Sequence, residues 1–165
     1  MSLAEILFPV KRDLQQVEVY LSRWAESTSP AIRKMARAVF KKPGKLIRPG
    51  ILLLAASHFG YKEKERITAA AAIEAIHTAS LIHDDIIDGS STRRGEKTIA
   101  TVYGEKFSLL VGDFFFIRSI TASVTAISPE ITEYLTRATE KMIEGEAEEL
   151  AHAFDFNLKE KTYWR

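Results

Sequence analysis

Cysteine is absent from this chain of 165 residues, which excludes disulfides and thiolate metal sites and fits a reducing compartment. Neither charge sign dominates, since 23 Lys and Arg face 22 Asp and Glu. This balance argues against bulk attraction to nucleic acid or to an anionic membrane. The apolar run 51–57 is too short to span a bilayer, and no basic leader precedes an apolar N-terminal segment. We therefore expect a cytoplasmic protein with no nucleic-acid partner and no transmembrane segment.

Strand-like alternation and internal repeats are also lacking, whereas apolar residues recur three or four positions apart, as in amphipathic helices. Ser-Pro pairs at 29–30 and 128–129 predict helix starts, because serine caps a helix and proline suits its first position. The expected helices cover about 4–24, 30–40, 49–59, 63–88, 106–126 and 129–153. A further helix would begin at a capping box formed by Asn157 and Glu160. The predicted fold class is all-α, with about six helices in one domain.

The expected helix 106–126 is strongly apolar around its circumference, which predicts burial on most sides. A small chain covers so much apolar surface more easily against a second copy of itself than alone. The sequence therefore predicts a homodimer.

Acidic residues gather at the end of the expected helix 63–88. Asp84 and Asp88 are four apart and share one face, Asp85 flanks them, and His77 lies close to the same stripe. Carboxylates at the C-terminal end of a helix repel one another and the helix dipole, unless a cation intervenes. The cluster predicts a divalent metal site.

Two cationic segments accompany this cluster. Arg93 and Arg94 follow it within a few residues, and Gly44, Lys45 and Arg48 precede an apolar helix. Guanidinium groups bind carboxylates and phosphates in paired hydrogen bonds. The arrangement predicts an anionic substrate held between a metal ion and these cations.

Together, these segments resemble the trans-isoprenyl diphosphate synthase (polyprenyl synthetase) family. The match runs from Gly44 to about Leu150 and includes G-K-x-x-R-P, H-x-x-S-L-I-H-D-D-x-x-D, R-R-G, the pair Gly112-Asp113 and the pair Gly145-Glu146. The resemblance implies an antiparallel helical bundle of the isoprenoid synthase type. It also implies a prenyltransferase that joins isopentenyl diphosphate to an allylic diphosphate.

The resemblance assigns roles to the motif residues. Asp84, Asp85 and Asp88 would coordinate Mg²⁺ ions that bridge the allylic diphosphate, with Arg93 beside it. The diphosphate of isopentenyl diphosphate would be held by the remaining motif residues: Gly44, Lys45, Arg48, His77 and Arg94. Hard oxygen ligands suit Mg²⁺, and positive charge around the leaving diphosphate promotes ionisation to an allylic carbocation.

Product length follows from the same resemblance. Bulky aromatic residues just before the aspartate motif stop chain growth early in this family, whereas here Ala79 and Ser80 precede Asp84 by five and four positions. We expect a medium- or long-chain all-trans product, and expect Ala79→Tyr to shorten it.

Two departures from the family pattern stand out. The family carries a second aspartate-rich motif, which this chain lacks before Arg165. Either the chain is a truncated synthase, or the missing acids come from elsewhere. We expect the N-terminal part of one synthase domain, inactive alone. Position 149 is Glu, where many relatives have Gln.

Three alternatives compete with this interpretation. A ferritin-like di-iron bundle would use Glu74-x-x-His77 and Glu149-x-x-His152 but leaves the cations unexplained. A terpene cyclase shares the aspartate motif but lacks the two cationic motifs. A non-catalytic or partner-dependent subunit of a heteromeric prenyl synthase is the third.

Overall fold

The computed structural model describes residues 2–41 and 44–164, and its regular structure is helical apart from one small hairpin. The N-terminal half contains α1 (Leu3–Leu7), the 3₁₀ turn η1 (Phe8–Val10), α2 (Lys11–Trp24), α3 (Pro30–Val39), α4 (Ile47–His58) and α5 (Glu63–Ile87). The rest contains β1 (Thr92–Arg93), β2 (Glu96–Lys97), α6 (Ile99–Tyr103), α7 (Glu105–Ala126), α8 (Pro129–Ala151) and α9 (Glu160–Tyr163). The predicted all-α class is confirmed.

The first expected helix, 4–24, is wrong as one continuous helix. A capping box of Ser2 and Glu5 opens α1, and the chain then passes through η1 before α2 begins. Pro9 lies inside η1 and has no N–H to donate, so a continuous α-helix would lose a hydrogen bond there. The short elements α1, η1 and α6 raise the number of helices above the expected six.

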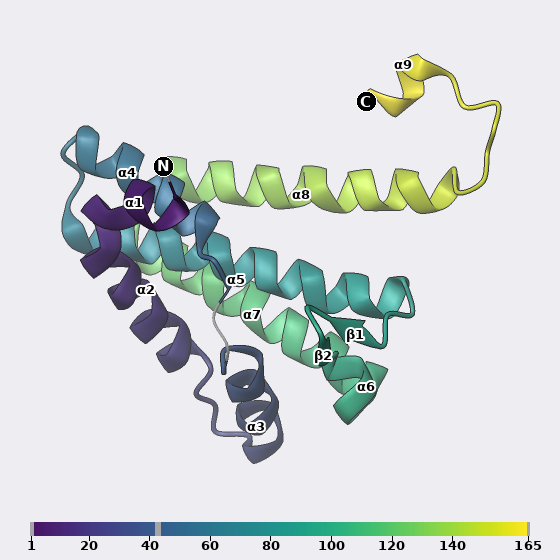
Figure 1. Cartoon of the computed structure of the whole chain (residues 1–165), viewed down its shortest axis with the longest axis horizontal. Helices are drawn as coiled ribbons and strands as arrows, with labels where there is room; N and C mark the ends of the chain where they lie inside the picture. The colour runs from purple at the N-terminus through teal and green to yellow at the C-terminus, as the bar shows by residue number, and fades with distance from the viewer. Residues whose placement is uncertain (1, 42–43, 165) are drawn as a thin grey trace.

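The centre of the molecule is the antiparallel pair of α5 and α7, whose mutual contact is the most extensive between any two elements (Figure 1). Alanines at 69–72, 75 and 79 are buried on α5. Small side chains let neighbouring backbones approach closely, so α5 can be covered by α2, α4 and α7 at once. This central position fixes where the acidic end of α5 lies.

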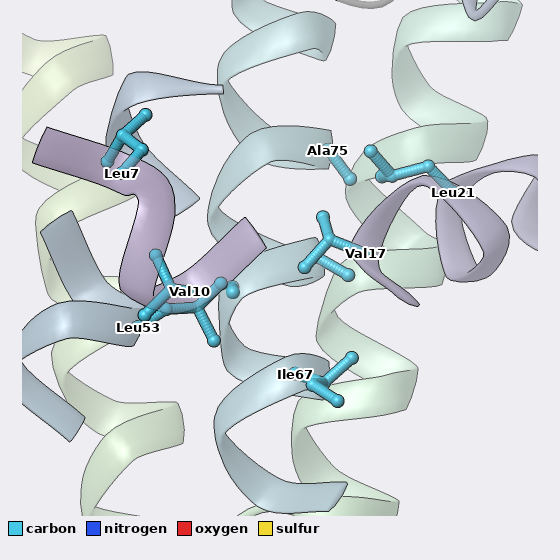
Figure 2. Packing of buried hydrophobic residues seen from close by; sticks show 9 residues of the cluster. Leu7, Val10, Val17, Leu21, Leu53, Ile67 and Ala75 are labelled. Atoms are coloured by element: carbon cyan, nitrogen blue, oxygen red, sulfur yellow. The ribbon is translucent and has the colours of Figure 1, made fainter. Parts of the chain in front are cut away.

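Two apolar clusters flank α5. The first joins η1, α2 and α4 to its N-terminal half through Val10, Val17, Leu53 and Ile67 (Figure 2). The second packs α3 and α7 against its C-terminal half. Each large aliphatic side chain buried in this way contributes about 1.5–3 kcal/mol. The two clusters together hold the long helix rigidly along its length.

A nearly buried ion pair reinforces the first cluster. Arg66 of α5 donates from Nε to Asp13 Oδ2 of α2 at 2.9 Å, and a second guanidinium nitrogen lies 2.9 Å from the same oxygen. Removing one partner of such a pair leaves an uncompensated charge. The pair therefore fixes the register of α2 along α5.

The predicted burial of α7 on most sides is wrong. Its buried residues form one stripe that includes Val111, Gly112 and Phe115, whereas Leu110 and Ile117 are 53% and 63% exposed. Within the described chain α7 contacts mainly α5, with smaller contacts to α6, α8 and α3. By length and composition, α7 is the one helix in the described ranges that could cross a membrane, with 33% of that window buried. One such helix is weak evidence for a membrane span, and the buried stripe of α7 packs along α5.

Helix α8 lies along the same direction as α5 in Figure 1, and it has no buried residue.

The capping box expected after α8, at the start of the last helix, is wrong, because α9 is preceded by Lys159 without a side-chain cap. The Asn157 N–H instead donates a hydrogen bond to Asp155 Oδ1 at 3.0 Å. This bond occupies the N–H that Asn157 would donate to Glu160 in a capping box.

The expectation of no strand is wrong at one place. β1 and β2 pair antiparallel, with Arg93 opposite Glu96, and the two residues between them have φ of +52° at Arg94 and +78° at Gly95. Positive φ at both central residues is the type I′ turn that matches the twist of a two-residue hairpin. The hairpin folds the two arginines back toward α5.

Candidate active site

The acidic cluster forms where α5 ends. Asp88 caps the helix and donates its N–H to the carbonyl of Asp84 at 2.8 Å, and Gly89 follows with a φ of +61°. Burial raises the pKa of Asp84, Arg93 opposes that shift, and the neighbouring charges of Asp88 and Asp85 add to it. The acids are thus close enough to repel one another.

Asp85 is paired with an arginine of the same chain. Its side chain is 9% exposed, and its Oδ1 accepts a hydrogen bond from Arg93 Nε at 2.7 Å. The structure therefore brings Asp85 and Arg93 together, as a charge-assisted bond that orients the guanidinium across the end of α5.

A further carboxylate faces this helix end from α8. Burial raises the pKa of Glu146, and the charges of Asp84, Glu149 and Asp88 raise it further. Sequence reasoning used Glu146 only as part of a family motif and missed its place beside the aspartates. The proximity of Glu146 to the aspartates depends on how α8 packs near α5, and two helices separate them in the sequence.

The donor chemistry of this acidic region fits a hard divalent cation, since all of its side chains offer oxygen. Within 2–41 and 44–164, however, no three acidic, His or Cys side chains converge closely enough to hold a metal ion by themselves. A cation here would need additional oxygen ligands, such as those of a diphosphate.

A second cluster lies along α5, roughly three helical turns before the aspartates. Gly44, Arg48, Glu74 and Arg94 come together from three segments of the chain. A Cβ placed on Gly44 would lie 3.0 Å from Arg94 Nη1 and 3.8 Å from Glu74 Oε1. A larger residue than glycine would therefore crowd the guanidinium.

His77 belongs to this second cluster. Burial lowers its pKa to about 4, and the charges of Arg48, Arg94 and Arg93 lower it further. The imidazole is neutral at physiological pH and can donate one N–H to an anion. Lys45, two residues before α4, and Arg48, in its first turn, are exposed, and across the described segments Lys45 makes no ion pair. Of the predicted substrate-binding set, Gly44, Arg48, His77 and Arg94 are thus brought together.

The two candidate chain-length residues, Ala79 and Ser80, have different surroundings. Ala79 is fully buried with Met35 and Phe115 in the second apolar cluster. Ser80 is half-buried and donates its hydroxyl to the carbonyl of His77 at 2.9 Å. A cavity of about 470 Å³ lies nearby between α5, α7 and α8. It is lined chiefly by apolar and threonine side chains, among them Ile76, Phe116, Ile120, Leu135, Thr139 and Ile143.

A glycine contact sets the spacing of α5 and α7 beside the acids. A Cβ on Gly112 would overlap Nε2 of His83, which lies 3.3 Å from the carbonyl of Leu109 and 3.6 Å from Asp113 Oδ1. Sequence reasoning noted the Gly112-Asp113 pair but not its partner. His83 thus anchors α7 next to Asp84.

The di-iron alternative is wrong. Glu149 is exposed on α8, and no ligand group of three side chains forms among the described residues that would combine it with Glu74 and His77. Glu74 instead lies among arginines, which disfavour a cation.

Comparisons with known proteins agree with this geometry. A family model described as polyprenyl synthetase matches residues 29–165. Octaprenyl diphosphate synthase of Haemophilus influenzae is 36% identical over 165 residues, which are 100% of this chain and 50% of that protein. Heptaprenyl diphosphate synthase component 2 of Geobacillus stearothermophilus is 35% identical over 154 residues, 93% of this chain and 48% of that one.

A solved structure shows the same fold. The polyprenyl synthase of Caulobacter crescentus, crystallised with calcium and isoprenyl diphosphate, superposes with a TM-score of 0.91 at 33% identity, over 98% of this chain and 49% of that one. The predicted isoprenoid synthase bundle is confirmed. The chain spans about half the length of the relatives that it matches, and it belongs to the polyprenyl synthetase family.

Proposed function

We propose that this chain provides the N-terminal part of a trans-polyprenyl diphosphate synthase that joins isopentenyl diphosphate to an allylic diphosphate. The observation that carries the proposal is the presence of two charge clusters beside one helix, α5. One is acidic, at the end of α5, and the other is cationic, around Gly44, Arg48 and Arg94. Two diphosphates of different chemistry would occupy them.

The acidic cluster suits the allylic diphosphate. Asp84 and Asp88 would hold Mg²⁺, which neutralises charge on the leaving diphosphate when bound. Arg93, fixed by Asp85, would donate to that diphosphate as its charge develops. Asp85 as a third metal ligand stays a prediction.

The cationic cluster suits the second substrate. Lys45, Arg48 and Arg94 would bind the diphosphate of isopentenyl diphosphate, and neutral His77 would donate a hydrogen bond. The double bond of that substrate would then face the allylic cation, attack it, and lose a proton to complete one elongation. No protein nucleophile is needed.

A medium- or long-chain product is part of the proposal. It is supported by the small side chains of Ala79 and Ser80, by the apolar cavity beside Ile76, and by octaprenyl and heptaprenyl synthases among the relatives. We also propose a homodimer, which would cover the exposed apolar side of α7.

Partner dependence is a second candidate, favoured by one observation. The relative from Geobacillus stearothermophilus is named as component 2 of its synthase. A chain of that kind would need a different partner polypeptide for turnover, which mixing with candidate partners would reveal.

Calorimetry tests the acidic site directly. Mg²⁺ alone should bind weakly, whereas Mg²⁺ with farnesyl diphosphate should bind well, because the diphosphate supplies the missing ligands. Asp84→Asn should weaken that joint binding about ten- to a hundredfold, the value of a charge-assisted contact. Glu133→Gln, an exposed change on α8, is the matched control. Joint binding unchanged in Asp84→Asn would show that the acids do not hold the metal.

A further inference from the structure

Glu74 is an unusual residue for a site that binds anions. It lies on α5, one turn before His77 on the same face, and it is 9% exposed. Its Oε1 and Arg94 Nη1 both approach the same side of Gly44. A carboxylate buried there repels any diphosphate bound by the neighbouring cations, so its presence calls for a reason.

The carboxyl has charged neighbours but no bonded partner. Arg48 of α4 and Arg94 of the hairpin turn are the charged groups that act on it, His77 is neutral, and α2, α7 and α8 add none in the described part of the chain. Across 2–41 and 44–164, Glu74 makes no hydrogen bond and no ion pair within 4.0 Å. The guanidinium groups of Arg48 and Arg94 are therefore not held in ion pairs with Glu74.

Resting on the proposed function of this site, we propose that Glu74 is a proton-linked counter-charge for the diphosphate of isopentenyl diphosphate. While the site is empty, the ionised carboxylate balances Arg48 and Arg94, whose like charges would otherwise repel each other. When the diphosphate binds, Glu74 takes up one proton from solvent. The neutral acid no longer repels the ligand and can donate its O–H to a phosphate oxygen.

The electrostatics of the empty site support this exchange. Burial raises the pKa of Glu74, and Arg48 and Arg94 counteract the shift. A diphosphate would neutralise the two arginines and add negative charge of its own, so both changes favour the protonated acid. Binding should therefore take up a proton, and affinity should rise as the pH falls.

The test is calorimetry with inorganic pyrophosphate in EDTA, where the metal-dependent acidic site is silent. Titrations at about pH 6 in buffers of different ionisation enthalpy count the protons exchanged. Pyrophosphate titrates itself, so the quantity of interest is the difference between wild type and Glu74→Gln. We expect wild type to take up as much as about one proton more than Glu74→Gln, and Glu74→Asp to retain part of this uptake.

Controls separate the possible failures. Glu63→Gln removes an exposed carboxylate from the same helix and should leave the proton count unchanged. Arg94→Gln should abolish most pyrophosphate binding; if it binds as wild type does, the proposed diphosphate site itself is wrong. If Arg94→Gln loses binding while wild type and Glu74→Gln take up equal numbers of protons, only the role of Glu74 is overturned.

A measurement on the wild type guards against misfolding of the variants. With glutamate carboxyls labelled by ¹³C, infrared difference spectra should gain a protonated carboxyl band when pyrophosphate is added. Absence of that band at pyrophosphate saturation would overturn the proposal.

Discussion

At the scale of single residues, the function of the cationic cluster depends on which groups are charged. His77 lies among three arginines and has a pKa of about 4, mainly because of burial. A protonated imidazole there would add a fourth positive charge to an empty site. The fold therefore selects the neutral ring, and the positive charge that attracts a diphosphate comes from the guanidiniums.

This selection predicts acid sensitivity. The pKa of His77 is lower in the folded state than its ordinary value of 6.5, so between about pH 6.5 and 4 the unfolded chain binds the extra proton. The free energy of unfolding should fall as the pH drops through that window. His77→Gln, which keeps a neutral donor, should flatten this slope in urea titrations at several pH values. An equally steep slope in the variant would assign the acid sensitivity to other groups.

Asp85 offers a second prediction at this scale. If it only positions Arg93, Asp85→Asn should weaken joint binding of Mg²⁺ and farnesyl diphosphate about tenfold, through the weakened charge-assisted bond. The dependence of that binding on Mg²⁺ concentration should then stay as in wild type. A changed dependence, as expected for Asp84→Asn, would instead show that Asp85 is a metal ligand.

At the scale of elements, the cavity between α5, α7 and α8 is the space that we propose for a growing prenyl chain. Ile76 lies four residues before Ser80 on α5, so both occupy one face of the helix, and Ile76 lines the cavity. Ala79 is enclosed by α3 and α7 instead. Ala79→Tyr would overpack that core at a cost of about 1–3 kcal/mol, which would obscure any effect on product length.

Ile76→Phe is therefore the cleaner test of product length. In a form of the chain that turns over, the added ring should fill part of the cavity and shorten the main product, with little loss of stability because Ile76 is only half-buried. Chromatography of dephosphorylated products measures this. Ile51→Phe, on an exposed face of α4, should leave the product unchanged. A wild-type product no longer than farnesol would contradict the medium- or long-chain proposal.

The elements that local chemistry specifies were predictable from sequence. Ser29 and Ser128 cap α3 and α8 as expected, each with proline at the first helical position, and the bounds of α5 lie within a residue of those predicted. The interruption at Pro9 and the Arg94-Gly95 turn carried local signals that were missed. Both signals are ambiguous, because proline also suits a helix start and a basic dipeptide before glycine is common in loops.

The remaining features depend on distant residues. Glu74 faces Arg48 and Arg94, Glu146 faces the aspartates, and Gly112 admits His83 only because separate helices pack together. No periodicity within one segment encodes such contacts. Residue types at the site were therefore readable from motifs, whereas their partners required the structure.

At the scale of the whole molecule, the exposed apolar helix faces and the incomplete set of metal ligands among the described residues both indicate that this chain needs further polypeptide to work. Helix α8 has no buried residue, and Ile143 and Leu150 on it are 58% and 54% exposed. The outer side of α7 is similarly open. Helix faces with several exposed apolar side chains often meet another chain or another part of the same domain.

We therefore predict that the 165-residue chain by itself has little or no synthase activity and binds ANS or self-associates. Ionising an allylic diphosphate needs positive charge around the leaving group from more than one side, and the described residues supply no complete ligand set. Losing about 4 kcal/mol of transition-state stabilisation slows a reaction roughly a thousandfold. The assay compares this chain, its mass verified, with a version extended to the length of its relatives, using isopentenyl and farnesyl diphosphates with Mg²⁺. Comparable turnover by the two would mean that α5 and α8 already form a working site, so that the open faces serve some other contact.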